Sequence, residues 1–340
     1  MFTPSEQPTT STTGVRKPRV TIPGITVEDL WLSPDTTVAA ALRGPDSAGM
    51  SALLFLDTAT GAQQGEVAVG PDELAVLSVG WSVGATHNWR QGEIQLWYPG
   101  SGEPARVLSP HRDRGVHAVA LSDDGTLAAS LGDEGSVALW RPHDGALLGR
   151  FQPMTELDVE TCALTFSPDS RWLAIRTDAD TLEIWSTSPL DFHDQLLETG
   201  PPVFSPDGRF VVTAGAVISL YDLREHAAPT LLPGRGPLAF TPDGSLLVAG
   251  APDGGTTVWR APSGGAQGHH RGGSPRALSP DGTVLVLTGL GTELILVDIA
   301  TGYTVSALTG PRGEVEALAV GPRGALVVAG CSDATLRVWA

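Results

Sequence analysis

The sequence predicts an all-β fold assembled from eight copies of one small structural unit. Three observations support this prediction: a turn of the type Ser-Pro-Asp-Gly recurs along the chain, a large apolar residue recurs at a nearly constant distance after it, and no segment spaces its apolar residues as a helix does. The composition agrees, because 41 glycines and 27 prolines among 340 residues suit many short strands joined by tight turns.

The recurring turn marks the first hairpin of each unit. Its first residue is, in chain order, Ser33, Ser78, Ser122, Ser167, Ser205, Thr241, Ser279 and Gly321. Aspartate favours such turns because its carboxylate accepts hydrogen bonds from nearby backbone amides. We therefore interpret the repeated carboxylates as turn residues and not as a catalytic set; they are Asp35, Asp124, Asp169, Asp207, Asp243 and Asp281.

A second recurring position ends the third strand of each unit. These anchor residues are Leu56, Trp97, Trp140, Trp185, Tyr221, Trp259, Val297 and Trp339. In five of the eight units the anchor follows the first turn residue by 18 residues. The anchors run from residue 56 to residue 339 in seven intervals, a mean period of about 40 residues, which matches four short strands per unit and the blade of a β-propeller.

The turns, the 18-residue spacing and the five anchor tryptophans resemble the WD-repeat β-propeller family over about residues 18–340. The resemblance implies an eight-bladed β-propeller of four-stranded antiparallel blades that acts as a non-enzymatic protein-interaction scaffold. The family's buried chain of His, Ser or Thr, Asp and Trp is mostly missing here. Only Asp253 and Asp333 keep the turn aspartate, and only Gly268-His269 keeps the Gly-His pair, so we expect core packing to carry more of the stability.

Closure of the ring requires one further strand. Unit 8 ends at Trp339-Ala340, after its third strand, and residues 19–24 (Arg-Val-Thr-Ile-Pro-Gly) have the pattern of a fourth strand. We expect this segment to pair with residues 335–339 and complete the last blade. The predicted organisation is a disordered N-terminal tail over residues 1–17, rich in Ser and Thr, followed by the propeller over residues 18–340.

Charge and composition exclude several classes of function. Asp and Glu number 38 against 21 Lys and Arg, and the resulting net charge of -17 disfavours nucleic-acid binding because the chain repels phosphate backbones. No apolar run approaches the roughly 18 residues of a membrane helix, so no membrane partner is expected. Cys162 and Cys331 cannot form a disulfide framework, which predicts a cytoplasmic location. A single lysine, Lys17, indicates a bacterial source with GC-rich codons.

The chain lacks the motifs of common enzymes. Its glycines fall at the repeated turns, not in a phosphate-binding loop, and no serine occupies a Gly-x-Ser-x-Gly turn. The adjacent His269 and His270 have no third ligand at a suitable spacing, so we predict no metal, no cofactor and no catalytic residue. An alternative of a different class stays open, namely a propeller enzyme or small-ligand binder that uses residues at the mouth of the central channel.

One group of side chains is not explained by the repeat. The loops between second and third strands, and those from each fourth strand to the next unit, must share one face of the ring, which we call the loop face; the other turns form the opposite turn face. In units 1 to 3 the loop face collects cationic and aromatic side chains. These form the predicted contact patch, which consists of Arg43, His87, Trp89, Arg90, His111, Arg112 and Arg114.

The contact patch has two interpretations. Trp89 can tuck under a loop while the arginines pair with Asp46 and Asp113, since surface ion pairs are common. Alternatively, the patch is a binding hot spot, because Trp and Arg dominate binding energy where they cluster. Arginine matches carboxylate and phosphate groups with paired hydrogen bonds, so the predicted ligand is another protein recognised through an acidic or phosphorylated segment.

Overall fold

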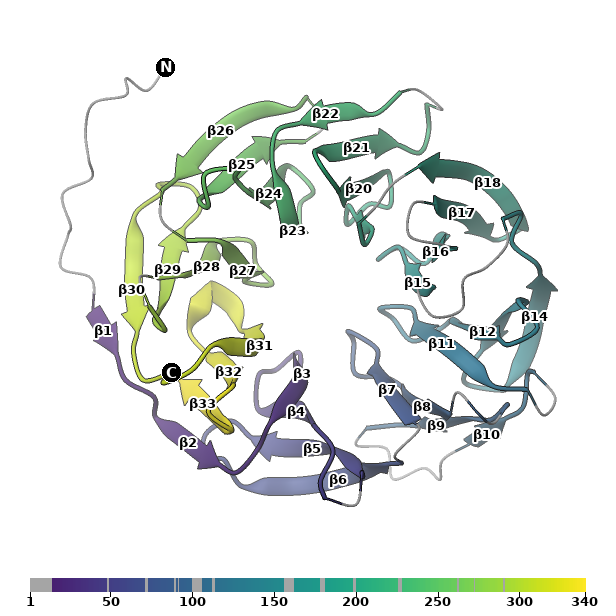
Figure 1. Cartoon of the computed structure of the whole chain (residues 1–340), viewed down its shortest axis with the longest axis horizontal. Helices are drawn as coiled ribbons and strands as arrows, with labels where there is room; N and C mark the ends of the chain where they lie inside the picture. The colour runs from purple at the N-terminus through teal and green to yellow at the C-terminus, as the bar shows by residue number, and fades with distance from the viewer. Residues whose placement is uncertain are drawn as a thin grey trace.

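The computed structural model describes residues 14–47, 49–70, 73–88, 90, 92–99, 106–111, 114–155, 162–177, 181–197, 200–225, 228–261, 263–271, 273–289 and 291–340. Eight antiparallel sheets follow one another around a common axis and form a closed ring (Figure 1). The predicted eight-bladed β-propeller is therefore confirmed. The only helical element among the described residues is the single 3-10 turn Pro322–Gly324.

Each blade contains four strands, which are named here in order from the axis outward. Blade 1 contains β3 (Val27–Leu32), β4 (Val38–Arg43), β5 (Ser51–Asp57) and β6 (Gln63–Val69); blade 2 contains β7 (Glu73–Leu77), β8 (Gly84–Asn88), β9 (Ile94–Trp97) and β10 (Arg106–Leu108). Blade 3 contains β11 (Val116–Leu121), β12 (Ala128–Gly132), β13 (Val137–Arg141) and β14 (Ala146–Phe151); blade 4 contains β15 (Ala163–Phe166), β16 (Trp172–Arg176), β17 (Thr181–Thr187) and β18 (Leu190–Leu197).

The second half of the ring repeats this order. Blade 5 contains β19 (Val203–Phe204), β20 (Phe210–Ala214), β21 (Ile218–Asp222) and β22 (Thr230–Leu232); blade 6 contains β23 (Arg235–Phe240), β24 (Leu246–Gly250), β25 (Thr256–Arg260) and β26 (Gly265–His270). Blade 7 contains β27 (Pro275–Leu278), β28 (Val284–Thr288), β29 (Leu294–Asp298) and β30 (Thr304–Leu308); blade 8 contains β31 (Val315–Val320), β32 (Val327–Cys331), β33 (Thr335–Trp339) and, on the outside, β2 (Val20–Pro23).

The hydrophobic core lies between neighbouring blades. Every residue of the second strand β12 is buried, because blades pack against both of its faces, whereas the outer strand β6 is exposed or half-buried up to its last residue. One core cluster combines Leu139 of blade 3 with Ile175 of blade 4. The anchor Trp339 is fully buried in the equivalent cluster between blades 7 and 8, which explains why the repeat places a large apolar residue there.

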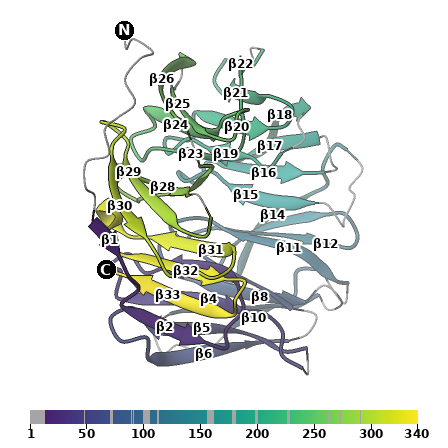
Figure 2. The ribbon, with the colours of Figure 1, turned by 60° about the vertical axis from the view of Figure 1, so that its left-hand side comes forward.

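The N-terminal segment closes the ring as predicted. Strand β2 pairs antiparallel with β33, from Val20 opposite Val338 to Pro23 opposite Thr335, and so becomes the outer strand of blade 8. Figure 2 shows β2 alongside β33. An N-terminal strand and the C-terminal strand therefore share one sheet.

One short strand lies where the sequence predicts a tail. Strand β1 (Gly14–Arg16) pairs in parallel with β30 and adds a fifth strand to the edge of blade 7. The guanidinium of Arg16 donates a hydrogen bond to the carbonyl of Gly324 in blade 8 at 2.8 Å, which fixes this strand across the junction of the two blades. The boundary of the predicted tail at residue 17 is thus corrected for residues 14–16, and residues 1–13 lie outside the described residues.

Each Ser-Pro-Asp-Gly turn is held by the same set of hydrogen bonds. In blade 3 the Ser122 hydroxyl donates to the Asp124 carboxylate at 2.7 Å and accepts from the amide of Leu127 at 2.9 Å, while Asp124 also accepts from the amide of Thr126 at 3.0 Å. The hydroxyl-to-carboxylate distance is 2.6 to 2.7 Å in all six turns that keep both residues. The repeated aspartates are therefore turn residues, as the sequence predicts.

These turns also contact one another from blade to blade. Asp281 in blade 7 accepts the backbone amide of Arg323 in blade 8 at 3.1 Å through both carboxylate oxygens. Burial alone would raise the pKa of Asp281, but the hydrogen bonds from Ser279, Arg323 and Thr283 outweigh it and hold the pKa at about 2. The ionised carboxylate thus links two blades on the turn face.

Truncation tests the closure of the ring. A chain that begins at Gly14 keeps β1 and β2 and should melt at the temperature of the full chain. A chain that begins at Ile25 lacks both strands and leaves the edge of β33 unpaired, so its melting temperature should fall by more than about 5 °C. A chain that begins at Arg19 isolates the effect of β1. Scanning calorimetry compares the three, and equal melting temperatures would contradict closure by β2.

Acid should weaken the link made by Asp281. Its folded-state pKa lies below the unfolded value of about 3.9, so its contribution to stability is complete above pH 4 and is lost as the pH falls toward 2. Asp281→Asn should lower the melting temperature by about 2 °C or more at pH 7 and have little effect at pH 2. Glu225→Gln, at an exposed position, is the control. An effect of Asp281→Asn that persists unchanged at pH 2 would contradict the role assigned to the ionised carboxylate.

Candidate binding surface

The topology assigns the predicted contact patch to the loop face of blades 1 to 3. Arg43 ends β4, Arg90 lies between β8 and β9, and Arg114 lies between β10 and β11, so all three come from loop-face segments of consecutive blades. Arg90 and Arg114 are exposed. Trp89 and Arg112 lie outside the described residues.

Arg43 takes a different position from the two exposed arginines. It is half-buried at the end of its strand, opposite Val27 of the inner strand and Ala52 of the third strand. Its Nε atom is buried and has no hydrogen-bond partner among the described residues. A buried donor without an acceptor is costly, so this guanidinium is a ready donor to a ligand that reaches the loop face.

His87 belongs to the interior and not to the surface. It is 3% exposed, and its Nδ1 lies 2.9 Å from the carbonyl oxygen of Val116 in the inner strand of blade 3. Burial lowers the pKa of His87 to about 4, against the opposing effect of that hydrogen bond. The neutral imidazole donates through Nδ1 and ties blade 2 to blade 3, so it is not presented to a partner.

His111 is also buried, at 2% exposure, within a hydrogen-bonded network of blade 3. Its Nε2 lies 2.8 Å from the hydroxyl of Ser130 and its Nδ1 lies 2.6 Å from the carboxylate of Glu134. Burial lowers the pKa of His111, although Glu134 opposes the shift. This network is a version of the buried chain of His, Ser or Thr and Asp that is typical of WD repeats, with Glu134 in place of the aspartate and Pro110 in place of the glycine.

The sequence alone does not reveal the hydrogen-bonded network of His111. Neither the Gly-His pair nor the turn aspartate is present in its usual form, so the motif is visible only once Ser130 and Glu134 lie beside the imidazole. The network stops at Ser130, because the indole nitrogen of Trp140 has no hydrogen-bond partner among the described residues. With both histidines inside the protein, the described part of the contact patch consists of Arg43, Arg90 and Arg114.

His269 forms a second small network, in blade 6. Its Nε2 lies 3.1 Å from Asp253 and its Nδ1 lies 3.2 Å from the hydroxyl of Thr257, both within the same blade. The Gly-His pair Gly268-His269 therefore lies in β26, the outer strand of blade 6. Within the described ranges, no three His, Cys, Asp or Glu side chains gather in the way that a metal site requires.

A further set of residues on the loop face was missed by sequence reasoning. The inner strands of blades 1, 3, 7 and 8 each carry a β-bulge, and the residues that the strand pairing skips are Glu28, His117, Arg276 and Glu316. Bulges re-aim side chains and are common beside functional sites. Three of the four stand exactly five residues before the first turn residue of their unit, a signal that could have found Glu28, His117 and Glu316.

The bulges bring opposite charges to three consecutive blades beside the axis. Glu28, Arg276 and Glu316 are exposed, and their inner strands β3, β27 and β31 are neighbours in the ring (Figure 1). Arg276 donates to the carbonyl oxygen of Val315 and so spans blades 7 and 8. His117 pairs instead with Asp133 of its own blade. Charged groups of both signs from blades 7, 8 and 1 therefore lie beside the axis on the loop face.

The eight blades form a closed β-propeller, and charged side chains of blades 7, 8 and 1 lie beside its axis on the loop face. Two segments, residues 102–141 and 302–340, match the family model described as WD domain, G-beta repeat. Each segment joins one outer strand to the three strands of the next blade, β10 to β13 and β30 to β33. A comparison with curated proteins finds no match.

Solved structures agree with the propeller fold. The C-terminal WD40 domain of Sif2 is similar with a TM-score of 0.69 and 14% sequence identity over 97% of this chain and 99% of that chain. The computationally designed Ika8 protein is similar with a TM-score of 0.71 and 20% identity over 96% of this chain and 99% of that chain. The chain therefore has the fold of an eight-bladed β-propeller, and two of its blades match the WD-repeat model. Within its described part, the structure has no helix with the length and hydrophobicity needed to span a bilayer.

The buried His87 should make the protein sensitive to mild acid. Its folded pKa of about 4 lies below the unfolded value of about 6.5, so its contribution to stability is complete above pH 6.5 and is lost as the pH falls toward 4, by about 3 kcal/mol. His87→Gln should be less stable at pH 7 but show a flatter pH dependence between 6.5 and 4. Urea unfolding across this range measures both, with His143→Gln as an exposed control. An equally steep dependence in His87→Gln would refute the assignment.

Proposed function

We propose that this protein is a non-enzymatic, cytoplasmic scaffold that recognises another protein through the loop face. WD-repeat propellers commonly act as protein-interaction scaffolds, and the fold is the first support for the proposal. The second is local: arginines from three consecutive blades occupy the loop face of a chain whose net charge is -17. This local concentration of positive charge on an acidic protein is the single observation that carries the proposal.

The proposed ligand is an acidic or phosphorylated segment of the partner. Arginine forms paired hydrogen bonds with carboxylate and phosphate oxygens, and these are stronger than bonds between neutral groups. Arg90 and Arg114 are exposed, and Arg43 has a buried donor atom without a protein acceptor among the described residues. Trp89 and Arg112 come from the same two loops and are part of the proposal on the sequence alone.

A second candidate function is a small-ligand site at the axis. The observation that favours it is the series of bulges, because Arg276 of blade 7 is followed in ring order by two carboxylates, Glu316 of blade 8 and then Glu28 of blade 1. A ligand with both cationic and anionic groups would match this arrangement. In the first candidate the same carboxylates repel an acidic segment and keep it away from the axis.

Charge reversal on the loop face tests the proposed function. A partner is first captured with the full chain and identified by mass spectrometry, and its binding is then titrated. Arg114→Glu and Arg90→Glu should each weaken binding by at least about thirtyfold, or 2 kcal/mol, with a nearly unchanged melting temperature, because both residues are exposed. Binding of the variants should also depend less on salt, since an attractive screened interaction is lost.

The matched control is Arg260→Glu. Arg260 is exposed and ends β25 on the turn face, so the same charge reversal is introduced on the opposite side of the ring. It should bind the partner as the wild-type protein does. Equal losses in all three variants would mean that net charge and not the contact patch governs binding. A loss in Glu28→Gln or Glu316→Gln alone would transfer the site to the axis.

A further inference from the structure

The turn face carries a cavity of about 830 Å³ that lies over blade 3 and extends to blades 2 and 4. On the side of blade 4 its apolar lining includes Leu127, Leu139 and Leu148 of blade 3, and the turn between the third and fourth strands of blade 4 contributes residues 187–190; blade 2 contributes Ser82, Val83 and Tyr98. Leu139 is fully buried in the core cluster of blades 3 and 4, so the cavity reaches from the surface down to the junction of these two blades. Its volume lies within the range of about 300 to 1,000 Å³ that ligand sites occupy.

Comparison with the next junction, between blades 4 and 5, shows which side chains the cavity lacks, because there the side chains of Trp172 and His193 occupy the corresponding space. The amide of Leu127 donates to the hydroxyl of Ser122 at 2.9 Å, and the amide of Trp172 donates to the hydroxyl of Ser167 at 2.9 Å. These two bonds belong to the same turn in successive blades. Leu127 and Trp172 are therefore equivalent positions, with an aliphatic side chain where the next blade has an indole.

A second equivalence comes from the outer strands. Both β14 and β18 contain a β-bulge, and the residues skipped by the pairing are Leu148 and His193. In blade 4 the rings of Trp172 and His193 pack against each other with tilted planes and centroids 4.4 Å apart, and Nε2 of His193 lies 2.8 Å from the carbonyl oxygen of Leu223 in blade 5. In blade 3 the same two positions hold leucines, which leave the cavity.

The third equivalence concerns the turn between the third and fourth strands of the following blade. The amide of Thr187 donates to the carbonyl of Arg171 at 2.9 Å, as the amide of Leu223 does to that of Arg209 at 2.9 Å. Thr187 thus stands where blade 5 has a buried leucine. Blades 3 and 4 thus have a smaller side chain at the first of these positions, a leucine in place of an imidazole at the second and a more polar side chain at the third, and two aromatic rings are missing.

We propose that this cavity is a second binding site, which receives an aromatic side chain from an extended segment of a partner protein. The ring takes the place that Trp172 and His193 fill at the next junction, packed against Leu127 and Leu148. A Trp or Tyr suits the site because its polar atom finds the hydroxyls of Thr187 and Ser188 at the rim. The proposal concerns the turn face and is independent of the contact patch on the loop face.

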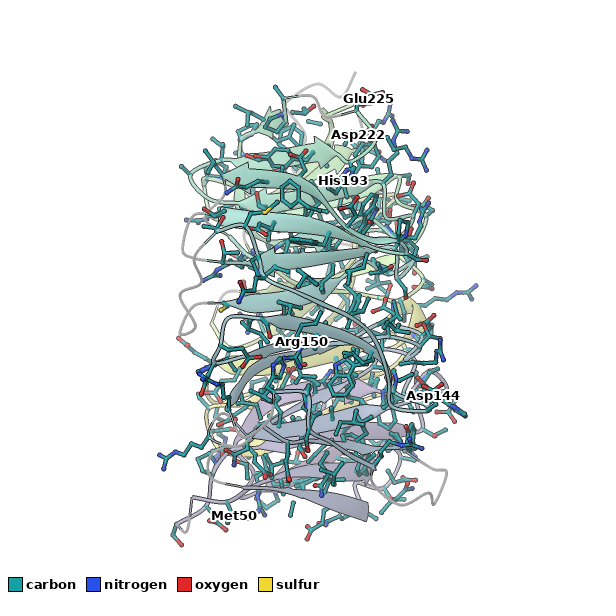
Figure 3. All side chains as sticks on the ribbon, turned by 90° about the vertical axis from the view of Figure 1, so that its right-hand side faces the viewer. Met50, Asp144, Arg150, His193, Asp222 and Glu225 are labelled. Atoms are coloured by element: carbon teal, nitrogen blue, oxygen red, sulfur yellow. The ribbon has the colours of Figure 1, made fainter. Side chains whose placement is uncertain are left out.

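The surroundings of the cavity favour a protein segment as the source of the ring. Leu147, next to Leu148 on β14, is 56% exposed and continues the apolar surface outside the cavity. The outer edge of β14 is unpaired within the described sheet, and blade 7 shows that this propeller accepts an added strand at such an edge, where β1 pairs with β30. Figure 3 shows this side of the ring, with Asp144 and Arg150 near the two ends of β14.

A library of random heptapeptides displayed on phage tests the proposal on the full chain. Peptides enriched by the wild-type protein should share a Trp, Tyr or Phe. Leu127→Trp combined with Leu148→His copies the blade 4 residues into blade 3 and should abolish their binding, while the melting temperature stays the same or rises by a few degrees because a cavity is filled. Enriched peptides that lack an aromatic residue, or no enrichment at all, would overturn the proposal.

A second pair of variants keeps the test decisive if the double variant does not fold. Leu148→Glu places a charge at the rim on a side chain that is 42% exposed and should weaken the selected synthetic peptides by at least about thirtyfold. Leu147→Glu introduces the same charge on the neighbouring residue, which does not line the cavity, and should change affinity much less. Equal losses would overturn the assignment to the cavity, and so would free indole that binds as tightly as the peptides, since that would point to a small molecule.

Discussion

The hydrogen bond between the first and third residues of each Ser-Pro-Asp-Gly turn is the interaction on which the rest of the structure depends. It reverses the chain within a few residues and fixes where the inner strand ends and the second strand begins. Because the turn also contacts the neighbouring blade, as Asp281 does through the amide of Arg323, one local motif sets both the hairpin and the spacing of blades. Cores between blades then follow from two-sided burial of the middle strands.

The two faces of the ring have separate origins in the sequence. The turn face is dictated by the repeat, so its departures from regularity stand out, and Leu127 and Leu148 are visible as departures because blade 4 provides the comparison. The loop face is built from segments that the repeat leaves unconstrained. Its arginines can vary without disturbing the hairpins, which is the property expected of a surface that selects a partner.

The period of the turns and anchors was sufficient to predict the number of blades and the closing strand, because both depend on local patterns that recur. The contact patch was predicted less well. His87 and His111 lie in loop-face segments by topology, but whether an imidazole points outward depends on its partners Val116, Ser130 and Glu134, which come from other strands. The bulges that present Glu28 and Arg276 are likewise set by pairing with the second strand, which a single strand does not reveal.

The pairing of β2 with β33 has a consequence for biosynthesis. Val20 and Val338 face each other across almost the entire length of the chain, so their contact is among the most non-local in the molecule. During translation β2 keeps an unpaired edge until β33 has left the ribosome. The other seven blades have the opportunity to assemble in chain order before that, whereas blade 8 is completed last.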